Sequence, residues 1–176
     1  MLTILTLIVD TIATLLGGVL LLRFWMQAVR VRPPSSVAQF TFQLSDWLVR
    51  PLRRIVPGVG GYDWASLIGA FLVVLLASSV WFIAGFSFEA VLLKALQRFL
   101  QWILYGFMAL LIIEAIFSWV NPHAPLAPFV RALNEPLLRP LRRVVPLVGN
   151  LDLSLLVALI LLQIAQILLG MIFGGR

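Results

Sequence analysis

The sequence predicts an all-α membrane protein built from two tandem repeats, and two observations predict this fold class. Of the 176 residues, 62% are hydrophobic and only 11% are charged, with a mean hydropathy of +1.07, which is far from the balance of a soluble globular domain. The tract RPLRRIVPGVGGYD at residues 50–63 also returns without a gap as RPLRRVVPLVGNLD at residues 139–152. Because each copy precedes a long apolar run, we assign one membrane unit to residues 1–88 and a second to residues 89–176.

Four apolar runs are long enough to cross the hydrocarbon core of a bilayer, which takes about 20 residues at helical rise. They are Leu2–Leu22, Trp64–Ala84, Phe99–Val120 and Leu153–Phe173. Two crossings per unit mean that both units enter the membrane in the same direction, so the repeats are expected to be parallel. The first run has no basic residue before it and no small-residue cleavage site after it, so we expect a retained helix and not a signal peptide.

Arginines are concentrated in the two long connections, which join the first run to the second and the third run to the fourth. The connection between the second and third runs holds only Lys94 and Arg98, offset by Glu89. The positive-inside rule therefore places the two long connections in the cytoplasm and both termini on the other side. With a formal net charge of +6 carried within a few helical turns of the membrane, we expect contact with anionic phospholipid and not with nucleic acid.

Each long connection contains a segment with apolar residues at helical spacing. The apolar positions are Val37, Phe40, Leu44, Trp47 and Leu48 in the first connection and Leu126, Phe129, Val130, Leu133 and Leu137 in the second. Such amphipathic helices lie in the interface plane, or re-enter partway and pack against the bundle. The alternative is that the stripe is ordinary core contact with the four membrane helices.

The repeated tract combines proline, arginine and glycine in a fixed order. Pro51 and Pro140 suit the first turn of a helix, where the missing N–H costs nothing. A guanidinium group binds phosphate oxygens bidentately, so the arginines of this helix are candidates for contact with lipid or with a partner. These are Arg50, Arg53, Arg54, Arg139, Arg142 and Arg143. The residues expected to break the helix and turn the chain are Pro57, Gly60, Pro146 and Gly149.

Asp63 and Asp152 stand immediately before the second and fourth apolar runs. A carboxylate at a helix start accepts hydrogen bonds from free backbone N–H groups and complements the helix dipole. The alternative is that each aspartate pairs with an arginine of its own or of the other repeat and fixes the loop against the bundle.

Asp10 and Glu114 lie inside apolar runs, where a charge at the helix centre costs about 2.5 to 3.5 kcal/mol. The repeat offset aligns Glu114 with Trp25, at nearly the depth of Arg23. We therefore predict an ion pair between Arg23 and Glu114 that joins the two halves. Otherwise Arg23 extends to the headgroups, and Glu114 is protonated or faces a water-filled gap.

The sequence offers no catalytic, cofactor or metal site. It contains no cysteine and a single histidine, His123, between Pro122 and Ala124. A serine, histidine and carboxylate at plausible separation, a phosphate-binding loop and paired histidine ligands are all absent from it. We therefore expect a protein that acts without catalysis and without a bound cofactor.

The doubled tract resembles the YggT family, also called YlmG, over nearly the whole chain. LLRFWMQ at residues 21–27 is similar to the end of the family's first helix, and NEPLLRPLRRVVP at residues 134–146 is similar to the signature of its second unit. One departure is that Trp64, Ala65 and Ser66 follow the first aspartate, where many relatives have an earlier serine and a proline.

The resemblance implies an integral membrane protein of the bacterial inner membrane, in a family without an established enzymatic activity. Relatives are linked to assembly of a cytochrome complex, to organisation of the nucleoid or the division apparatus, and to potassium uptake in osmotic shock. We expect an assembly or organising factor whose arginine tracts hold anionic phospholipid, an unidentified membrane protein or a second copy of the chain. The alternative is a channel or an accessory protein for potassium uptake, and a channel would need an oligomer because four helices leave little room for a pore.

Overall fold

The computed structural model describes residues 2–145 and 152–174, and this part of the chain is entirely helical apart from turns and one isolated β-bridge, Val59–Tyr62. In chain order the helices are α1 (Leu2–Ala28), α2 (Ser35–Ile55), α3 (Trp64–Ser78), the 3₁₀ helix η1 (Ser79–Phe82), α4 (Phe88–Val120), α5 (Ala127–Leu141) and α6 (Leu153–Gly174). Within the described residues, four helical stretches are long and apolar enough to cross a membrane: Ile4–Ala28, Trp64–Phe82, Phe88–Val120 and Leu153–Gly174.

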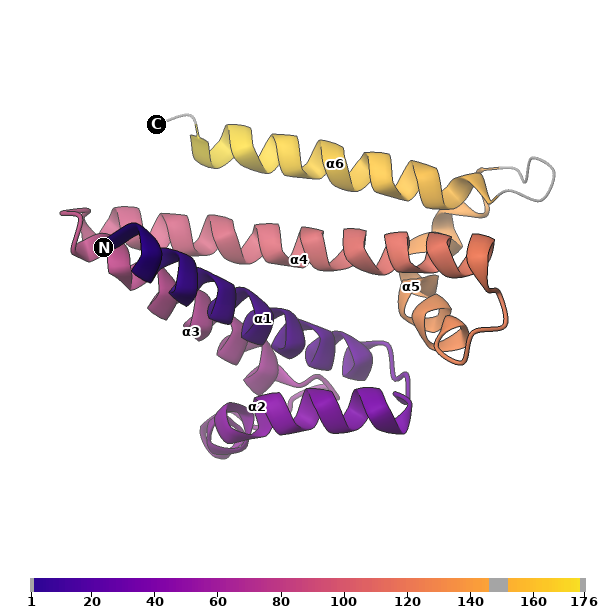
Figure 1. The fold of residues 1–176 in the computed structure, drawn as a ribbon, viewed down its shortest axis with the longest axis horizontal. Coiled ribbons are helices and arrows are strands. Elements are labelled where there is room, and N and C mark those ends of the chain that lie inside the picture. Colours follow the sequence, from indigo (N-terminus) through magenta and orange to yellow (C-terminus); the bar gives the residue numbers. More distant parts are fainter. Residues whose placement is uncertain (1, 146–151, 175–176) are drawn as a thin grey trace.

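The helices of the two halves follow in the same order, a membrane helix, a connecting helix and a second membrane helix (Figure 1). α1 and α4 both start at the end of the molecule where the two marked termini lie, and α3 and α6 both return to that end (Figure 1). The opposite end carries the connections from α1 to α2 and from α4 to α5, with α2 and α5 beside them (Figure 1). The arginine-rich tracts therefore gather at one end of the helix bundle.

α4 begins earlier than the apolar run predicted. The run was placed at Phe99–Val120, whereas the helix starts at Phe88 and has 33 residues. Its start is fixed by the Ser87 side chain, which accepts a hydrogen bond from Ala90 N–H at 3.3 Å, and by Glu89 in the first turn. At 1.5 Å per residue α4 is about 50 Å long, well over the roughly 30 Å of a hydrocarbon core, so charged side chains are accommodated in its first turns.

The prediction that Pro51 and Pro140 begin helices is wrong. Pro51 lies inside α2, and Pro140 lies inside α5 together with Pro136. Each of these prolines removes one helical hydrogen bond and bends the helix without ending it. α2 changes direction before it ends at Ile55, as Figure 1 shows. The amphipathic segment and the arginine tract thus form one bent helix in the first half, whereas in the second half the helix ends at Leu141, before Arg142 and Arg143.

The turn after α2 uses the residues expected to break the helix. α2 ends two residues before Pro57, and Gly60 and Gly61 have φ angles of 69° and 81°. This left-handed conformation favours glycine, which has no Cβ to clash with the following carbonyl. The corresponding residues of the second half, Pro146 and Gly149, lie outside the described residues.

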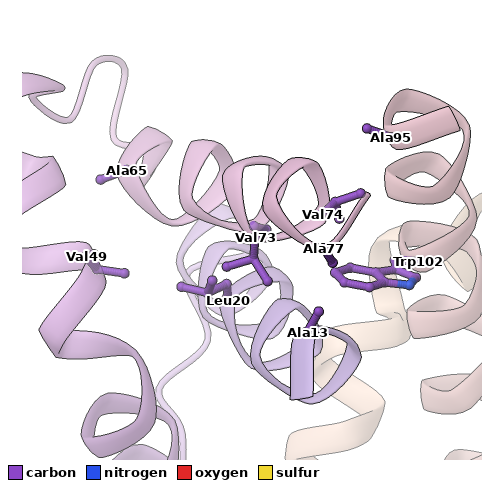
Figure 2. Close-up of a cluster of buried hydrophobic side chains, with 10 residues drawn as sticks. Ala13, Leu20, Val49, Ala65, Val73, Val74, Ala77, Ala95 and Trp102 are labelled. Carbon is purple, nitrogen blue, oxygen red and sulfur yellow. The ribbon is translucent and has the colours of Figure 1, made fainter. Parts of the chain in front are cut away.

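The core of the first half lies between α1, α3 and the start of α4. Figure 2 shows Leu20 of α1 and Val74 of α3 among small side chains, with the Trp102 ring of α4 at the edge of the cluster. Gly17 allows the close approach of this ring, because a Cβ atom on Gly17 would stand 2.1 Å from the Trp102 Cζ3 atom. α4 thus belongs to the second repeat in sequence but completes the core of the first.

A second core cluster joins α4, α5 and α6. Its buried members are Leu111, Leu138, Leu155, Ala158 and Leu162. The two clusters together run along α4, which makes this helix the shared support of the molecule.

The connecting helices α2 and α5 differ in which side they bury. In α2 the apolar stripe is largely exposed, with Phe40, Leu44 and Trp47 at 59%, 42% and 65% exposure. The side of α2 that faces the bundle is buried at Thr41, Ser45 and Val49. In α5 the equivalent stripe turns inward. Its residues Val130 and Leu133 are buried, as is Leu138 beyond them.

α1 ends in a hydrogen-bonding pattern that normally selects glycine. Arg30 N–H donates to Gln27 O and Val31 N–H donates to Met26 O, both at 3.0 Å, which is the Schellman arrangement. The residue that turns the chain is Arg30, with a φ of 58°. A side chain in this conformation costs about 1 kcal/mol more than glycine does.

Candidate functional site

In the first half, the repeated arginine and aspartate of the tract bind each other. Arg53 Nε and Nη2 donate to Asp63 Oδ1 and Oδ2 at 3.2 and 2.6 Å, a two-point contact between α2 and the start of α3. The same carboxylate accepts from the Ser66 backbone N–H at 3.4 Å and from the Ser66 hydroxyl at 2.6 Å. Asp63 is therefore both the cap of α3 and the partner of an arginine from its own repeat, so the two alternatives for this residue hold together.

Arg23 of α1 completes this first cluster. Its Nη1 donates to Ser45 Oγ at 2.6 Å and to Asp46 Oδ1 at 2.7 Å, and its Nε lies 3.5 Å from Asp63 Oδ2. The guanidinium also lies over the Phe42 ring, 4.8 Å from the ring centre, and the whole residue is only 5% exposed. Arg23 thus ties α1 to α2 and to the start of α3.

In the second half a single guanidinium gathers three carboxylates. Arg142 Nε donates to Asp152 at 2.8 Å, Nη1 to Glu135 at 2.9 Å and Nη2 to Glu114 at 3.4 Å. Asp152 also accepts from the Ser154 backbone N–H at 3.0 Å. The contact between Arg142 and Asp152 repeats that between Arg53 and Asp63, 89 residues further along the chain.

The predicted ion pair between Arg23 and Glu114 is wrong. Glu114 is 5% exposed and bonds within its own half, to Arg142 and to Asn134 Nδ2 at 2.7 Å. Among the described residues, Arg23 has carboxylate partners only at Asp46 and Asp63. The repeat offset places Arg23 and Glu114 at matched depth in the membrane. Arg23 nevertheless points toward α2, whereas Glu114 points toward α5.

The two clusters carry opposite surpluses of charge. The first contains three guanidinium groups and two carboxylates, and the second contains one guanidinium group and three carboxylates. The residues are Arg23, Arg50, Arg53, Asp46 and Asp63 in the first cluster, and Arg142, Glu114, Glu135 and Asp152 in the second. The difference arises because α1 contributes Arg23 and α4 contributes Glu114, and because Arg50 joins the first cluster whereas its counterpart Arg139 makes no ion pair with any described residue.

The pKa values of the capping aspartates follow from these contacts. Burial acts to raise the pKa of Asp63, but the hydrogen bonds from Arg53 and Ser66 outweigh it and hold the pKa below its ordinary value of 3.8. Burial also acts to raise the pKa of Asp152, but the hydrogen bonds from Arg142 and Ser154 outweigh it, so this pKa is lowered as well. Both aspartates are therefore ionised at neutral pH and keep their arginines bound.

The other arginines of the tract point outward. Arg50 has a side chain that is 78% exposed and forms an ion pair with Asp46 at 2.7 Å. Arg54, Arg139 and Arg143 are exposed and make no hydrogen bond or ion pair with any residue that the structure describes. Of the six arginines predicted to contact lipid or a partner, the structure thus directs Arg53 and Arg142 inward and leaves four on the surface.

The two halves are joined at this end by Trp25 and not by a charge pair. The indole Nε1 of Trp25 donates to the Leu133 carbonyl oxygen of α5 at 2.9 Å, and the ring packs edge-on against Phe107 of α4 at a centre distance of 4.8 Å. Trp25 occupies the repeat position of Glu114, so the same position serves the junction in one half and the ion cluster in the other.

A further ion pair near the other end of the molecule escaped the sequence prediction. Arg98 Nη1 of α4 donates to Asp10 Oδ1 of α1 at 2.7 Å, and the Arg98 guanidinium lies 5.5 Å from the centre of the Trp102 ring. The available signal was that an aspartate in the first apolar run and an arginine just before the third lie near the same predicted membrane face.

The helices and their ion-paired connections define a multi-pass helical membrane protein. The chain belongs to the CCB3/YggT family, whose model matches it twice, at residues 2–84 and 93–173, and this confirms the resemblance seen in the repeated tract. It is 37% identical over 180 residues to an uncharacterized protein from the proC 3′ region of Vibrio alginolyticus, covering 95% of this chain and 94% of that one.

Two further relatives extend this comparison. The uncharacterized protein YggT of Escherichia coli K12 is 32% identical over 171 residues, covering 91% of this chain and 86% of that one. An uncharacterized protein of Pseudomonas aeruginosa is 35% identical over 169 residues, covering 92% and 85%. No solved structure matches the chain.

Proposed function

We propose that this protein is a non-catalytic organising factor of the bacterial inner membrane, which uses its outward arginines to hold anionic phospholipid at the cytoplasmic face. Its two halves act as parallel repeats, with α2 and α5 at the level of the headgroups and both termini on the opposite side. The bound lipid, or the acidic segment of a membrane protein in its place, is what the protein positions.

The division of the arginines supports this role. Each tract places one arginine, Arg53 or Arg142, against the capping aspartate of the next membrane helix. The next residues in the sequence, Arg54 and Arg143, are exposed. Each is separated from the start of the next membrane helix by only a short stretch of sequence. One arginine of each pair fixes the geometry of the loop, so the other is presented to the headgroup region from a rigid base.

The exposed side of α2 supports the same placement. Phe40 and Trp47 stand at 59% and 65% exposure on a helix whose end carries Arg50 and Arg54. Aromatic side chains beside arginines are the composition of helices that lie in the membrane interface, with the rings among the upper acyl chains and the guanidinium groups at the phosphates. The bundle cannot bury these rings, because the inward side of α2 is already packed against it. The membrane interface is where they can be buried.

Exchange of the outward arginines tests the proposal. The triple variant Arg54→Gln, Arg139→Gln and Arg143→Gln should retain less phosphatidylglycerol than the wild type when both are extracted from native membranes into nanodiscs and their lipids are quantified. A matched Arg→Lys triple variant should lie between the two, because it keeps the charge and loses the bidentate geometry. Equal phosphatidylglycerol content in all three proteins would reject the proposal.

The alternative role in potassium uptake is separated by a flux measurement. The purified protein in liposomes should pass no more potassium than empty liposomes do if it is an organising factor. Potassium flux that rises with the amount of protein would replace the proposed function by transport.

A further inference from the structure

A cavity of about 290 Å³ lies between the end of α1 and α2 in the first half. Two guanidinium groups line it, those of Arg23 and Arg53, together with Gln27 and the Phe42 ring. The remaining lining residues include Val31 and Pro33 of the connection between the helices. Cationic groups at a cavity with an apolar rim are the arrangement that recognises an oxyanion.

Both guanidinium groups keep donors that the protein itself does not use. Arg23 Nη1 donates to Ser45 and Asp46, and its Nη2 makes no hydrogen bond to any described residue. Its Nε is fully buried and has no hydrogen-bond partner in the described chain. Arg53 donates from Nε and Nη2 to Asp63, and its Nη1 makes no hydrogen bond to any described residue, on a side chain that is half-exposed. A buried donor without a partner costs free energy, so such groups mark where an acceptor is missing.

The charge around the cavity favours an anion. The first cluster has one more guanidinium group than it has carboxylates. Its two carboxylates, Asp46 and Asp63, are shared among three arginines, so the cluster keeps a net positive charge beside the cavity. Arg30 stands nearby, with its Nη2 about 4.0 Å from where a Cβ atom on Gly61 would lie, and the Gly61 carbonyl oxygen accepts from Gln27.

The second half contains no equivalent of this cavity's chemistry. The repeat positions of Arg23, Gln27 and Phe42 are Ile112, Ile116 and Arg131. Only Arg53 has a matching arginine, Arg142, and that group is occupied by three carboxylates. The residues that line this cavity are therefore not conserved between the repeats at these positions, and the feature does not follow from the repeat.

We propose that the cavity lined by Arg23, Arg53 and Gln27 binds one phosphate group. The inference deepens the proposed function and rests on it for the placement of α2 at the membrane surface. It adds a single site that binds one phosphate group to the surface formed by the outward arginines. The phosphate belongs either to a phospholipid headgroup or to free phosphate in solution, and the chemistry of recognition is the same for both.

Ligand-dependent melting of the purified full chain tests the site. Detergent-solubilised protein stripped of lipid is melted with inorganic phosphate in one series and with dioctanoyl phosphatidylglycerol in the other, and dioctanoylglycerol serves as the control without phosphate. At least one phosphate-bearing probe should raise the melting temperature with saturation at one equivalent. Stabilisation by inorganic phosphate identifies a soluble ligand, and stabilisation by the phospholipid alone identifies a headgroup.

Two variants locate the binding. Gln27→Glu brings a carboxylate to the cavity without touching any ion pair, and should raise the half-saturating concentration at least about tenfold. Arg23→Lys should weaken binding to a similar degree, because one donor cannot replace the planar fork. Should Arg23→Lys fail to fold, Gln27→Glu decides alone, provided that its melting temperature without probe equals that of the wild type.

The matched control is Gln39→Glu, which adds the same carboxylate at an exposed position of α2 outside the cavity lining and should bind the probes as the wild type does. Absence of saturable stabilisation by either probe, or equal binding by Gln27→Glu and the wild type, would overturn the proposal. Loss of bulk phosphatidylglycerol enrichment in the triple Gln variant is a separate readout, so the surface role and the cavity can fail independently.

Discussion

At the scale of single residues, the sequence identified the aspartates at the helix starts correctly but could not say which arginine binds them. Arg50, Arg53 and Arg54 fall on one side of a helix, and nothing in their spacing distinguishes Arg53 from its neighbours. The distinction comes from the turn through Gly60 and Gly61, which folds Asp63 back toward α2. Such long-range geometry is absent from a local pattern.

The inward arginines should be far more important to stability than their neighbours. Arg142→Gln leaves Glu114 buried and Asp152 with its Ser154 contact alone, and should lower the free energy of unfolding by about 2 to 3 kcal/mol. Arg143→Gln should change it by less than about 0.5 kcal/mol, since that side chain is exposed. Thermal melting of both variants in the same detergent compares them directly, and equal melting temperatures would contradict the assigned roles.

The lowered pKa values predict a loss of stability in acid. Because the pKa values of Asp63 and Asp152 are lower in the folded protein than their ordinary value of 3.8, their contribution is fully present above about pH 4. It is lost as the pH falls through the folded-state values. The melting temperature should therefore decline more steeply below pH 4 in the wild type than in the double variant Asp63→Asn, Asp152→Asn, and parallel curves would show that these carboxylates do not contribute.

At the scale of helices, the hydrophobic pattern predicted the four membrane helices but not the faces they share. The offset of 89 residues gave the depth of Glu114 relative to Arg23, whereas pairing also depends on the angle at which each side chain leaves its helix. The extension of α4 back to Phe88 was missed for a different reason. A search for uninterrupted apolar residues stops at Arg98 and Lys94, although both are tolerated in a helix that is longer than the membrane is thick.

Neighbouring glycines of α1 should respond to alanine in opposite ways. A Cβ atom on Gly17 would meet the Trp102 ring at 2.1 Å, so Gly17→Ala should displace that buried ring and cost about 1 to 3 kcal/mol. Gly18 has no atom within 4 Å of an added Cβ among the described residues, so Gly18→Ala should be neutral or should stabilise by up to about 1 kcal/mol through helix propensity. Thermal melting of the two variants, with tryptophan fluorescence to follow Trp102, checks the pair.

The end of α1 offers a stabilising change. Arg30→Gly keeps the two backbone hydrogen bonds of the Schellman arrangement and removes the side chain from its left-handed conformation. We expect a gain of about 1 kcal/mol in the free energy of unfolding. A lower melting temperature in Arg30→Gly would show that the Arg30 side chain contributes more to folding than its conformation costs.

At the scale of the whole molecule, the two marked ends of the chain lie at one end of the bundle and the arginine tracts at the other (Figure 1). The arginine bias predicted which end faces the cytoplasm, and this orientation is open to direct test. A C-terminal alkaline phosphatase fusion should be active and a C-terminal green fluorescent protein fusion dark, because both would be outside the cytoplasm. The opposite pair of results would place the arginine tracts outside and remove the basis of the proposed lipid contact.

Because the two ion clusters differ, the two halves of the chain are not interchangeable. A chain assembled from two first halves would lack Glu114, the buried carboxylate that contacts the arginine of the second tract. A chain of two second halves would lose Trp25, the residue that reaches α5 from α1. Although the halves still share their tract, the junction between them depends on a side chain that only the first half supplies, so two copies of the second half could not reproduce it.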